Sequence, residues 1–170
     1  MPNTFTKIAS VTVGLLGAAS MDFTSIPATY TDLCIKLSGR SGRLAQQADN
    51  LFITFNSNTS GYTMRALSGN GSSASSVSYS SRYASFSVDA AGSTANTFSN
   101  HEIYIPNYAS ANNKSYSADS VSENNATAAQ SDLVAGLWSN TAAITSISLL
   151  PEVSTWVQYS TATLYGIKNS

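Results

Sequence analysis

Residues 50–56 read Asn-Leu-Phe-Ile-Thr-Phe-Asn, and this stretch indicates how the chain folds. Leu51, Ile53 and Phe55 alternate with polar residues, which is the period-two pattern of a strand with one buried and one solvated face. Phe52 breaks the alternation, because it places an aromatic ring on the otherwise polar face. The stretch therefore predicts a half-buried β-strand that carries one aromatic side chain, Phe52, on its otherwise polar face.

The same kind of segment recurs along the chain. Short runs of β-branched and aromatic residues end in Gly, Asn or Ser about every ten positions, whereas helical periodicity is scarce. We predict strands over residues 5–13, 20–23, 32–38, 51–56, 62–67, 77–83, 98–105, 115–123, 133–138, 144–150 and 156–167. Successive strands without intervening helices predict an all-β fold, an antiparallel two-sheet sandwich that is jelly-roll-like. A length of 170 residues fits one such domain, so we expect residues 1–170 to form a single β-sandwich.

The composition argues against several classes of partner. Charged residues make up 10 % of the chain and the formal net charge is −1, so the expected surface is neutral and polar. Lys and Arg are scattered, and without a basic stripe no nucleic-acid partner is expected. No apolar run approaches the roughly 20 residues of a membrane-spanning helix, so we expect no membrane insertion. The first residues alternate apolar side chains with Ser, Thr and Gly, and they predict a strand rather than a signal peptide.

The chain has one cysteine and one histidine. Cys34 lies among Leu33, Ile35 and Leu37, which predicts a reduced, packed thiol. His101 shares its predicted strand face with Ile103, and we expect it to be a packed or subunit-contact residue rather than a base.

Motifs for catalysis or cofactor binding are missing from the sequence. There is no Gly-x-Ser-x-Gly nucleophile turn and no Gly-x-x-x-x-Gly-Lys-Ser phosphate loop, and the nine acidic residues stand singly. Asp119, Glu123, Asn124 and Asn125 could supply oxygen ligands to calcium, but they form no EF-hand loop. We expect no enzymatic activity, no cofactor and no metal site.

Three loops are candidates for binding. The low-complexity region 68–85 contains Gly-Asn-Gly at 69–71, which predicts a tight turn or an exposed loop, and then Tyr79, Arg82 and Tyr83 among serines. That composition is typical of recognition loops, although a mobile connection would look similar. Tyr108 in the loop 107–114 is a further candidate, and a third loop spans 123–130. Tyrosines beside asparagines could stack on sugar rings, the alternative being that they belong to the core or to an interface.

The last predicted strand, 156–167, has no purely apolar face. Such a strand either bends between two sheets or has its second face covered by another subunit, and we favour the second interpretation. Trp156, Tyr159 and Tyr165 are therefore candidate assembly residues.

Six stretches of the sequence are informative beyond their amino-acid composition, because together they resemble a known group of proteins. They are Phe-Thr-Ser-Ile-Pro-Ala-Thr-Tyr-Thr-Asp-Leu (23–33), Leu-Ser-Gly-Asn-Gly-Ser-Ser (67–73), Glu-Ile-Tyr-Ile-Pro-Asn-Tyr (102–108), Glu-Asn-Asn-Ala-Thr (123–127), Gly-Leu-Trp-Ser-Asn-Thr-Ala-Ala-Ile-Thr-Ser-Ile (136–147) and Gln-Tyr-Ser-Thr-Ala-Thr-Leu-Tyr-Gly-Ile (158–167). Together they resemble small β-sandwich virion structural proteins of tailed bacteriophages, including those of cyanobacteria, over nearly the whole chain.

The resemblance implies a virion protein made in the host bacterial cytoplasm, which agrees with a single free cysteine. It implies assembly with itself, expected to be a homotrimer, and with other virion proteins. We expect a host-facing tail-fibre or baseplate adhesin that could contact a surface glycan. The alternatives are a capsid decoration (cement) protein that stabilises the phage head, a carbohydrate-binding module outside a virion and, last, a glycan hydrolase.

Overall fold

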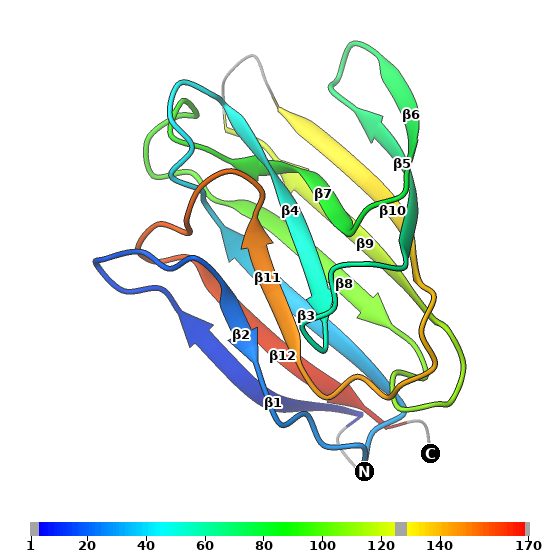
Figure 1. Ribbon diagram of the computed structural model, residues 1–170. Helices are drawn as coiled ribbons and strands as arrows, with labels where there is room; N and C mark the ends of the chain where they lie inside the picture. Colours follow the sequence, from blue (N-terminus) through cyan, green and yellow to red (C-terminus); the bar gives the residue numbers. More distant parts are fainter. Residues whose placement is uncertain (1–3, 125–128, 169–170) are drawn as a thin grey trace.

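The computed structural model describes residues 4–124 and 129–168, and within these ranges the chain forms twelve strands and no helix (Figure 1). The strands are β1 (Phe5–Thr12), β2 (Met21–Phe23), β3 (Asp32–Gly39), β4 (Ala48–Phe55), β5 (Tyr62–Gly69), β6 (Ala74–Tyr79), β7 (Tyr83–Asp89), β8 (Ser99–Ile105), β9 (Lys114–Ser122), β10 (Gln130–Trp138), β11 (Ile147–Pro151) and β12 (Thr161–Ile167). They pair antiparallel in two sheets of eight and four strands, so the predicted all-β sandwich is confirmed. No helix that could span a membrane occurs in the described part of the chain.

Eight of the strands form what we call the frame. Their pairing is nested, since β1 pairs with β12, β2 with β11, β3 with β8 and β4 with β7. The frame contributes β1-β12-β3-β8 to one sheet and β2-β11-β4-β7 to the other. Pairing of strands from the two ends of the chain inward, divided between two packed sheets, is the arrangement of a jelly roll.

The other four strands form what we call the extension. β5 and β6 are inserted between β4 and β7, and β9 and β10 between β8 and β11. They lengthen the larger sheet in the order β8-β9-β10-β5-β6. β7, the last strand of the smaller sheet, lies over β9 and β10. The β5–β6 hairpin therefore projects past the smaller sheet, at the upper right of Figure 1.

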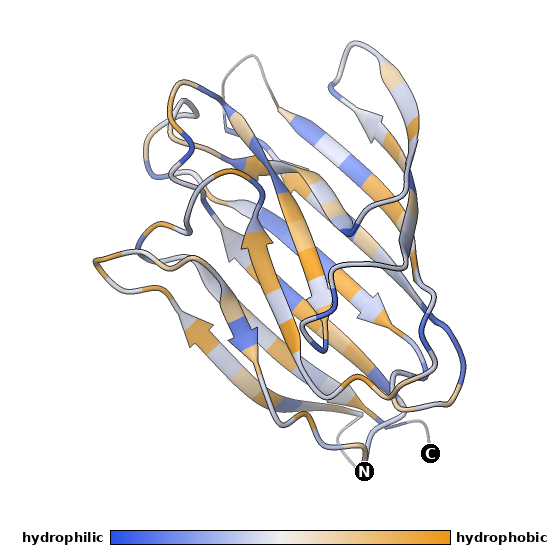
Figure 2. Cartoon of the chain, in the orientation of Figure 1, coloured by the Kyte–Doolittle hydropathy of each residue, from blue (hydrophilic) through white to orange (hydrophobic). Residues whose placement is uncertain are grey.

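Alternation of apolar residues sets the core between the sheets. Leu51, Ile53 and Phe55 of β4 are fully buried, as the sequence predicted, and β4 and β11 are among the most hydrophobic strands in Figure 2. On β8, Ile103 and Ile105 point inward, while Tyr104 between them is exposed. The buried apolar side chains form one continuous cluster that reaches from the frame into the extension.

The largest differences from the predicted strand bounds occur in two segments. The segment predicted as one strand, 77–83, contains a turn at 80–82, where the chain leaves the larger sheet and enters the smaller one. The other, 156–167, begins only at Thr161, because Tyr159 has a positive φ of 73° that an extended strand cannot accommodate. Neither break contains a Gly or a Pro, the residues that usually mark such a turn, so local patterns did not predict it.

The region 68–85 is more regular than a mobile loop. Ala74–Tyr79 forms β6, which pairs with β5 in register from Gly69↔Ala74 to Met64↔Tyr79. The predicted turn is present at the tip of this hairpin, where Gly71 has a φ of 83° and the side-chain oxygen of Asn70 accepts hydrogen bonds from the amides of Ser72 and Ser73.

Candidate functional site

Four aromatic rings gather where β6 turns into β7, and we call Phe52, Tyr79, Tyr83 and Phe86 the aromatic cluster. Tyr83 is its centre, because its ring centroid lies 4.8 Å from that of Phe52, 5.4 Å from that of Tyr79 and 5.0 Å from that of Phe86. Tyr79 is 47 % exposed, whereas the other three side chains are half-buried. The out-of-phase Phe52 of the sequence pattern thus has a place in this cluster.

Arg82 completes the cluster from the turn between the two strands. Its guanidinium carbon lies 4.3 Å from the centroid of the Phe52 ring, within the range of a cation–π interaction. Its backbone carbonyl accepts a hydrogen bond from the amide of Ile53 at 3.0 Å, which fixes the turn against β4. The structure therefore brings together three of the predicted binding residues, Tyr79, Arg82 and Tyr83.

Tyr83 is held by hydrogen bonds at both ends. Its hydroxyl donates to Glu152 at 2.9 Å, and its carbonyl accepts from the hydroxyl of Tyr116 at 3.0 Å. Burial, together with the hydrogen bond and the charge of Glu152, raises the pKa of Tyr83 to about 12. The hydroxyl is therefore a neutral donor at physiological pH.

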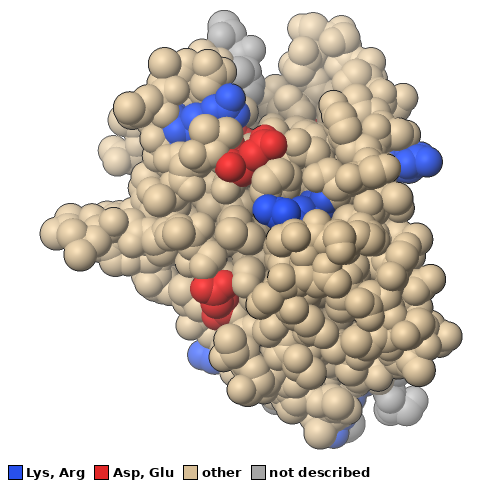
Figure 3. All heavy atoms as spheres, viewed as in Figure 1, with Lys and Arg blue, Asp and Glu red and all other residues tan. Residues whose placement is uncertain are grey.

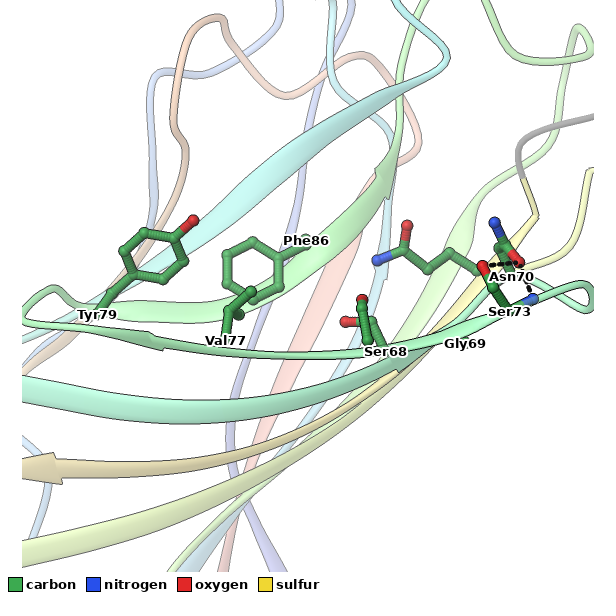
Figure 4. A pocket seen from close by; sticks show the side chains of 9 residues that line it. Ser68, Gly69, Asn70, Ser73, Val77, Tyr79 and Phe86 are labelled. Carbon is green, nitrogen blue, oxygen red and sulfur yellow. Dashed lines mark hydrogen bonds between the residues drawn. The ribbon is translucent and has the colours of Figure 1, made fainter.

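A pocket of about 230 Å³ opens beside the aromatic cluster, under the β5–β6 hairpin (Figure 4). Its lining residues are Ser68, Gly69, Asn70, Ser73, Ser75, Val77, Tyr79, Phe86 and Gln130. Figure 4 shows Tyr79, Val77 and Phe86 at one end, and Ser68, Asn70 and Ser73 at the other. The pocket thus has an apolar half and a polar half.

Asp132 lies behind the pocket and forms hydrogen bonds with residues that line it. This buried carboxylate accepts hydrogen bonds from Gln130 Nε2 at 2.6 Å, Ser68 Oγ at 2.7 Å and the amide of Phe86 at 2.9 Å. Burial alone would raise the pKa of Asp132, but the hydrogen bonds from Gln130, Ser68 and Phe86 outweigh it and lower the pKa. Asp132 is therefore ionised at neutral pH and fixes three pocket residues.

Asp132 is part of a larger buried network of polar side chains. Ser85 of β7 contacts Ser120 of β9 at 2.8 Å and Ser87 at 3.1 Å, so hydroxyls join the two sheets where apolar contacts would be usual. Asp89 continues the network, because it accepts hydrogen bonds from Ser122 and from Asn124.

His101 lies in the same buried layer. Its Nε2 is 2.8 Å from Ser99 Oγ, a spacing that a nucleophile and its base would have, but both side chains are almost fully buried and Ser99 Oγ also donates to the carbonyl of Gly39 at 2.8 Å. Burial lowers the pKa of His101 to about 4, although the nearby charges of Asp132 and Asp89 act to raise it. The expected packed histidine is confirmed.

Tyr108 and Trp156 are not at the surface where their predicted roles would need them. Tyr108 is fully buried, with its hydroxyl donating to the carbonyl of Pro27, so it does not join the other candidate binding residues. Trp156 is also fully buried and donates from Nε1 to the carbonyl of Leu149 at 2.9 Å. It packs within its own chain and leaves no surface for a second subunit. Both rings contact residues distant in the sequence, Tyr108 at Pro27 and Trp156 at Gly39, which no local pattern predicts.

The two other candidate assembly residues reach the surface. Tyr159 is 69 % exposed in the loop before β12, and Tyr165 is half-buried on the outer face of β12, opposite Cys34 of β3. Cys34 itself is buried, as predicted, but on this outer face, where its other cross-strand neighbour is Tyr104. Burial raises the pKa of the Cys34 thiol, which keeps it protonated.

The candidate calcium residues do not converge. Asp119 is exposed on β9, whereas Asn124 is buried and donates to Asp89, and Asn125 lies outside the described residues. Among residues 4–124 and 129–168, no group of three or more His, Cys, Asp or Glu side chains could hold a metal ion.

The chain was also compared with known proteins. No protein-family model, no curated protein sequence and no solved structure matches it.

Proposed function

We propose that the chain is a structural component of a tailed-bacteriophage particle, positioned in the tail fibre or baseplate, and that the aromatic cluster with Arg82 makes its contact with the host. The observation that supports this proposal is the half-exposed cluster itself, with Tyr79 47 % exposed at the projecting hairpin. Aromatic and arginine side chains provide most of the binding energy at interfaces. The side chains of the aromatic cluster are partly buried against one another, so they are already ordered before a partner binds.

The sparse surface charge agrees with such a role. In the face shown in Figure 3, charged side chains are few and of both signs, so long-range attraction of an oppositely charged partner would be weak. Contact would then depend on shape, aromatic packing and hydrogen bonds. As part of the same proposal, the chain acts as an oligomer, expected to be a homotrimer, with Tyr159 and Tyr165 as its candidate contact residues.

A second function, capsid decoration, is favoured by a different observation. The outer face of the larger sheet exposes Leu67, Val121 and Leu133, and Leu67 stands directly opposite Leu133 in the pairing of β5 with β10. Exposed apolar residues gathered on a broad sheet mark a protein-contact surface. A cement protein would use such a face to lie on a capsid lattice.

Immunogold labelling of intact particles of the phage that encodes the chain tests the proposal and separates it from its rival. A tail-fibre or baseplate protein gives label at the tail end that meets the host. Label spread over the head establishes capsid decoration instead, and particles that carry no label overturn both assignments.

A further inference from the structure

We infer that the pocket beside the aromatic cluster binds an uncharged sugar ring, with Tyr79 and Phe86 against the ring and the amides of Asn70 and Gln130 on its hydroxyls. The inference builds on the proposed function, because it gives a chemical class to the ligand of the same surface. It depends on four features of the pocket: its size, its apolar half, its polar half and its charge.

The size of the pocket limits the ligand. Its volume of about 230 Å³ lies below the range of about 300–1,000 Å³ that holds drug-sized molecules. One sugar ring, or one residue of a longer glycan, is of the scale that such an open pocket accommodates.

The apolar half offers a stacking surface. Tyr79 and Phe86 line the same end, with ring centroids 6.0 Å apart and a tilt of 55°, and Val77 lies between them in Figure 4. The C–H groups of a sugar ring form an apolar face that packs on aromatic rings, while its hydroxyls point outward. Tyr79 also brings a hydroxyl to the edge of this surface.

The polar half offers both kinds of hydrogen-bonding group that a hydroxyl needs. Asn70 uses its side-chain oxygen to cap the hairpin turn, and within the described residues its Nδ2 has no protein partner. Gln130 donates from Nε2 to Asp132, which orients the amide and leaves Oε1 without a partner among those same residues. One oriented donor and one oriented acceptor, with serine hydroxyls beside them, match adjacent sugar hydroxyls.

The charge of the site selects for an uncharged ligand. No Lys, Arg, Asp or Glu side chain is among the residues that line the pocket. The ionised Asp132 lies directly behind Gln130 and Ser68, so an anionic sugar would meet a negative charge with no cation facing it. A wholly apolar ligand is also disfavoured, since it would cover the amides of Asn70 and Gln130 without giving them partners.

Titration of the isotope-labelled full chain, followed by NMR, tests the inference. The probes are methyl glycosides of glucose, galactose, mannose and N-acetylglucosamine, with glucuronic acid as the charged comparison. We expect at least one neutral glycoside to shift the amide signals of β6, Phe86 and Gln130, and to bind more tightly than glucuronic acid.

Three variants show whether stacking is responsible. Tyr79→Ala should weaken binding about tenfold or more, as the loss of an aromatic contact typically does. Tyr79→Phe keeps the ring and should retain most of the affinity. Leu44→Ala removes a more exposed apolar side chain outside the pocket and should leave affinity unchanged.

The outcomes separate this inference from the proposed function. The inference is overturned if no neutral glycoside binds, if the shifts lie outside the pocket, or if Tyr79→Ala binds like the wild type. Should that happen while tail label and host adsorption remain, the particle role stands without a sugar ligand. If the protein binds a sugar but is absent from phage particles, the sugar-binding inference stands and the proposed function is wrong.

Discussion

The frame and the region where it meets the extension differ in the side chains that they bury. In the frame, Ile35, Ile53 and Leu149 are fully buried and belong to the continuous apolar cluster. Where β7 of the frame meets β9 and β10 of the extension, the buried side chains include Ser85, Ser87, Ser120 and Asp132. One sandwich thus has an apolar interior over most of its area and a hydrogen-bonded interior next to the candidate site.

The difference indicates a division of roles. Apolar packing is non-directional and tolerates exchange between side chains of similar volume. A buried hydrogen-bond network is directional, because each donor must meet its acceptor or remain unsatisfied at a cost. The frame therefore supplies stability, while the polar layer holds Gln130 and Phe86 in fixed positions for the pocket above them.

The largest effect is expected from shortening the chain before Trp156. This truncation removes β12, which lies between β1 and β3, and takes the buried Trp156 and Leu164 out of the core. Several buried side chains at about 2–3 kcal/mol each exceed the net stability of a typical domain. We expect no cooperative thermal transition by circular dichroism, whereas a control chain ending at Lys168 should melt cooperatively. A truncated chain that melts cooperatively would contradict the role given to the frame.

A comparison of near-isosteric exchanges in the two interiors should give the next largest effect. Asp132→Asn places an N–H group where the carboxylate accepts from Ser68, Gln130, Ser85 and Phe86, and we expect it to lower the free energy of unfolding by about 3–4 kcal/mol. Ile35→Leu in the frame should cost less than about 1.5 kcal/mol. Urea denaturation measures both. Equal urea midpoints for the two variants would show that the polar and apolar interiors tolerate near-isosteric exchanges equally well.

Acid should destabilise the polar layer through His101. The folded pKa of about 4 lies below the ordinary 6.5, so between these values the unfolded chain binds a proton that the folded protein excludes. The free energy of unfolding should therefore be at its full value above pH 6.5 and fall toward pH 4, by up to about 3 kcal/mol. Urea midpoints measured across this range test the slope.

His101→Leu is the matched control, because it removes the titrating ring from the same buried position. Its stability should depend less on pH between 6.5 and 4 than that of the wild type. An unchanged slope would assign the acid sensitivity to other groups.

Cys34 should show a smaller effect, because it lies on the outer face of the sheet rather than between the layers. Cys34→Ala removes a buried sulfur beside Tyr104 and Tyr165 and should cost about 1–2 kcal/mol by urea denaturation. Assembly, followed by light scattering, should not change. Loss of the proposed oligomer with unchanged melting would give the thiol a role outside packing.

Local patterns in the sequence predicted the parts of the fold that depend on near neighbours. Alternation placed Ile53 and His101 in buried positions, the apolar neighbours of Cys34 predicted its burial, and Gly-Asn-Gly at 69–71 predicted the hairpin tip. Phe52 was a usable signal as well, since an aromatic ring out of phase with its strand needs a partner outside the main core.

Contacts between distant segments could not be predicted in the same way. Asp132 bonds to Ser68 and Phe86, which are 64 and 46 positions away, so nothing near any one of them marks the pocket. Tyr108 and Trp156 resembled surface aromatics because the segments that cover them lie elsewhere in the chain. In each case the tertiary arrangement, rather than local propensity, decides exposure.

Host adsorption of phage particles carrying Tyr79→Ala tests the central claim most directly. Tyr79 is the most exposed member of the aromatic cluster and makes its ring contacts with Tyr83 and Phe86, so this change should lower the free energy of unfolding by about 1 kcal/mol and leave the frame intact. We expect the adsorption rate constant to fall about tenfold while the particles remain complete. Adsorption at the wild-type rate would contradict the assignment of host contact to the extension.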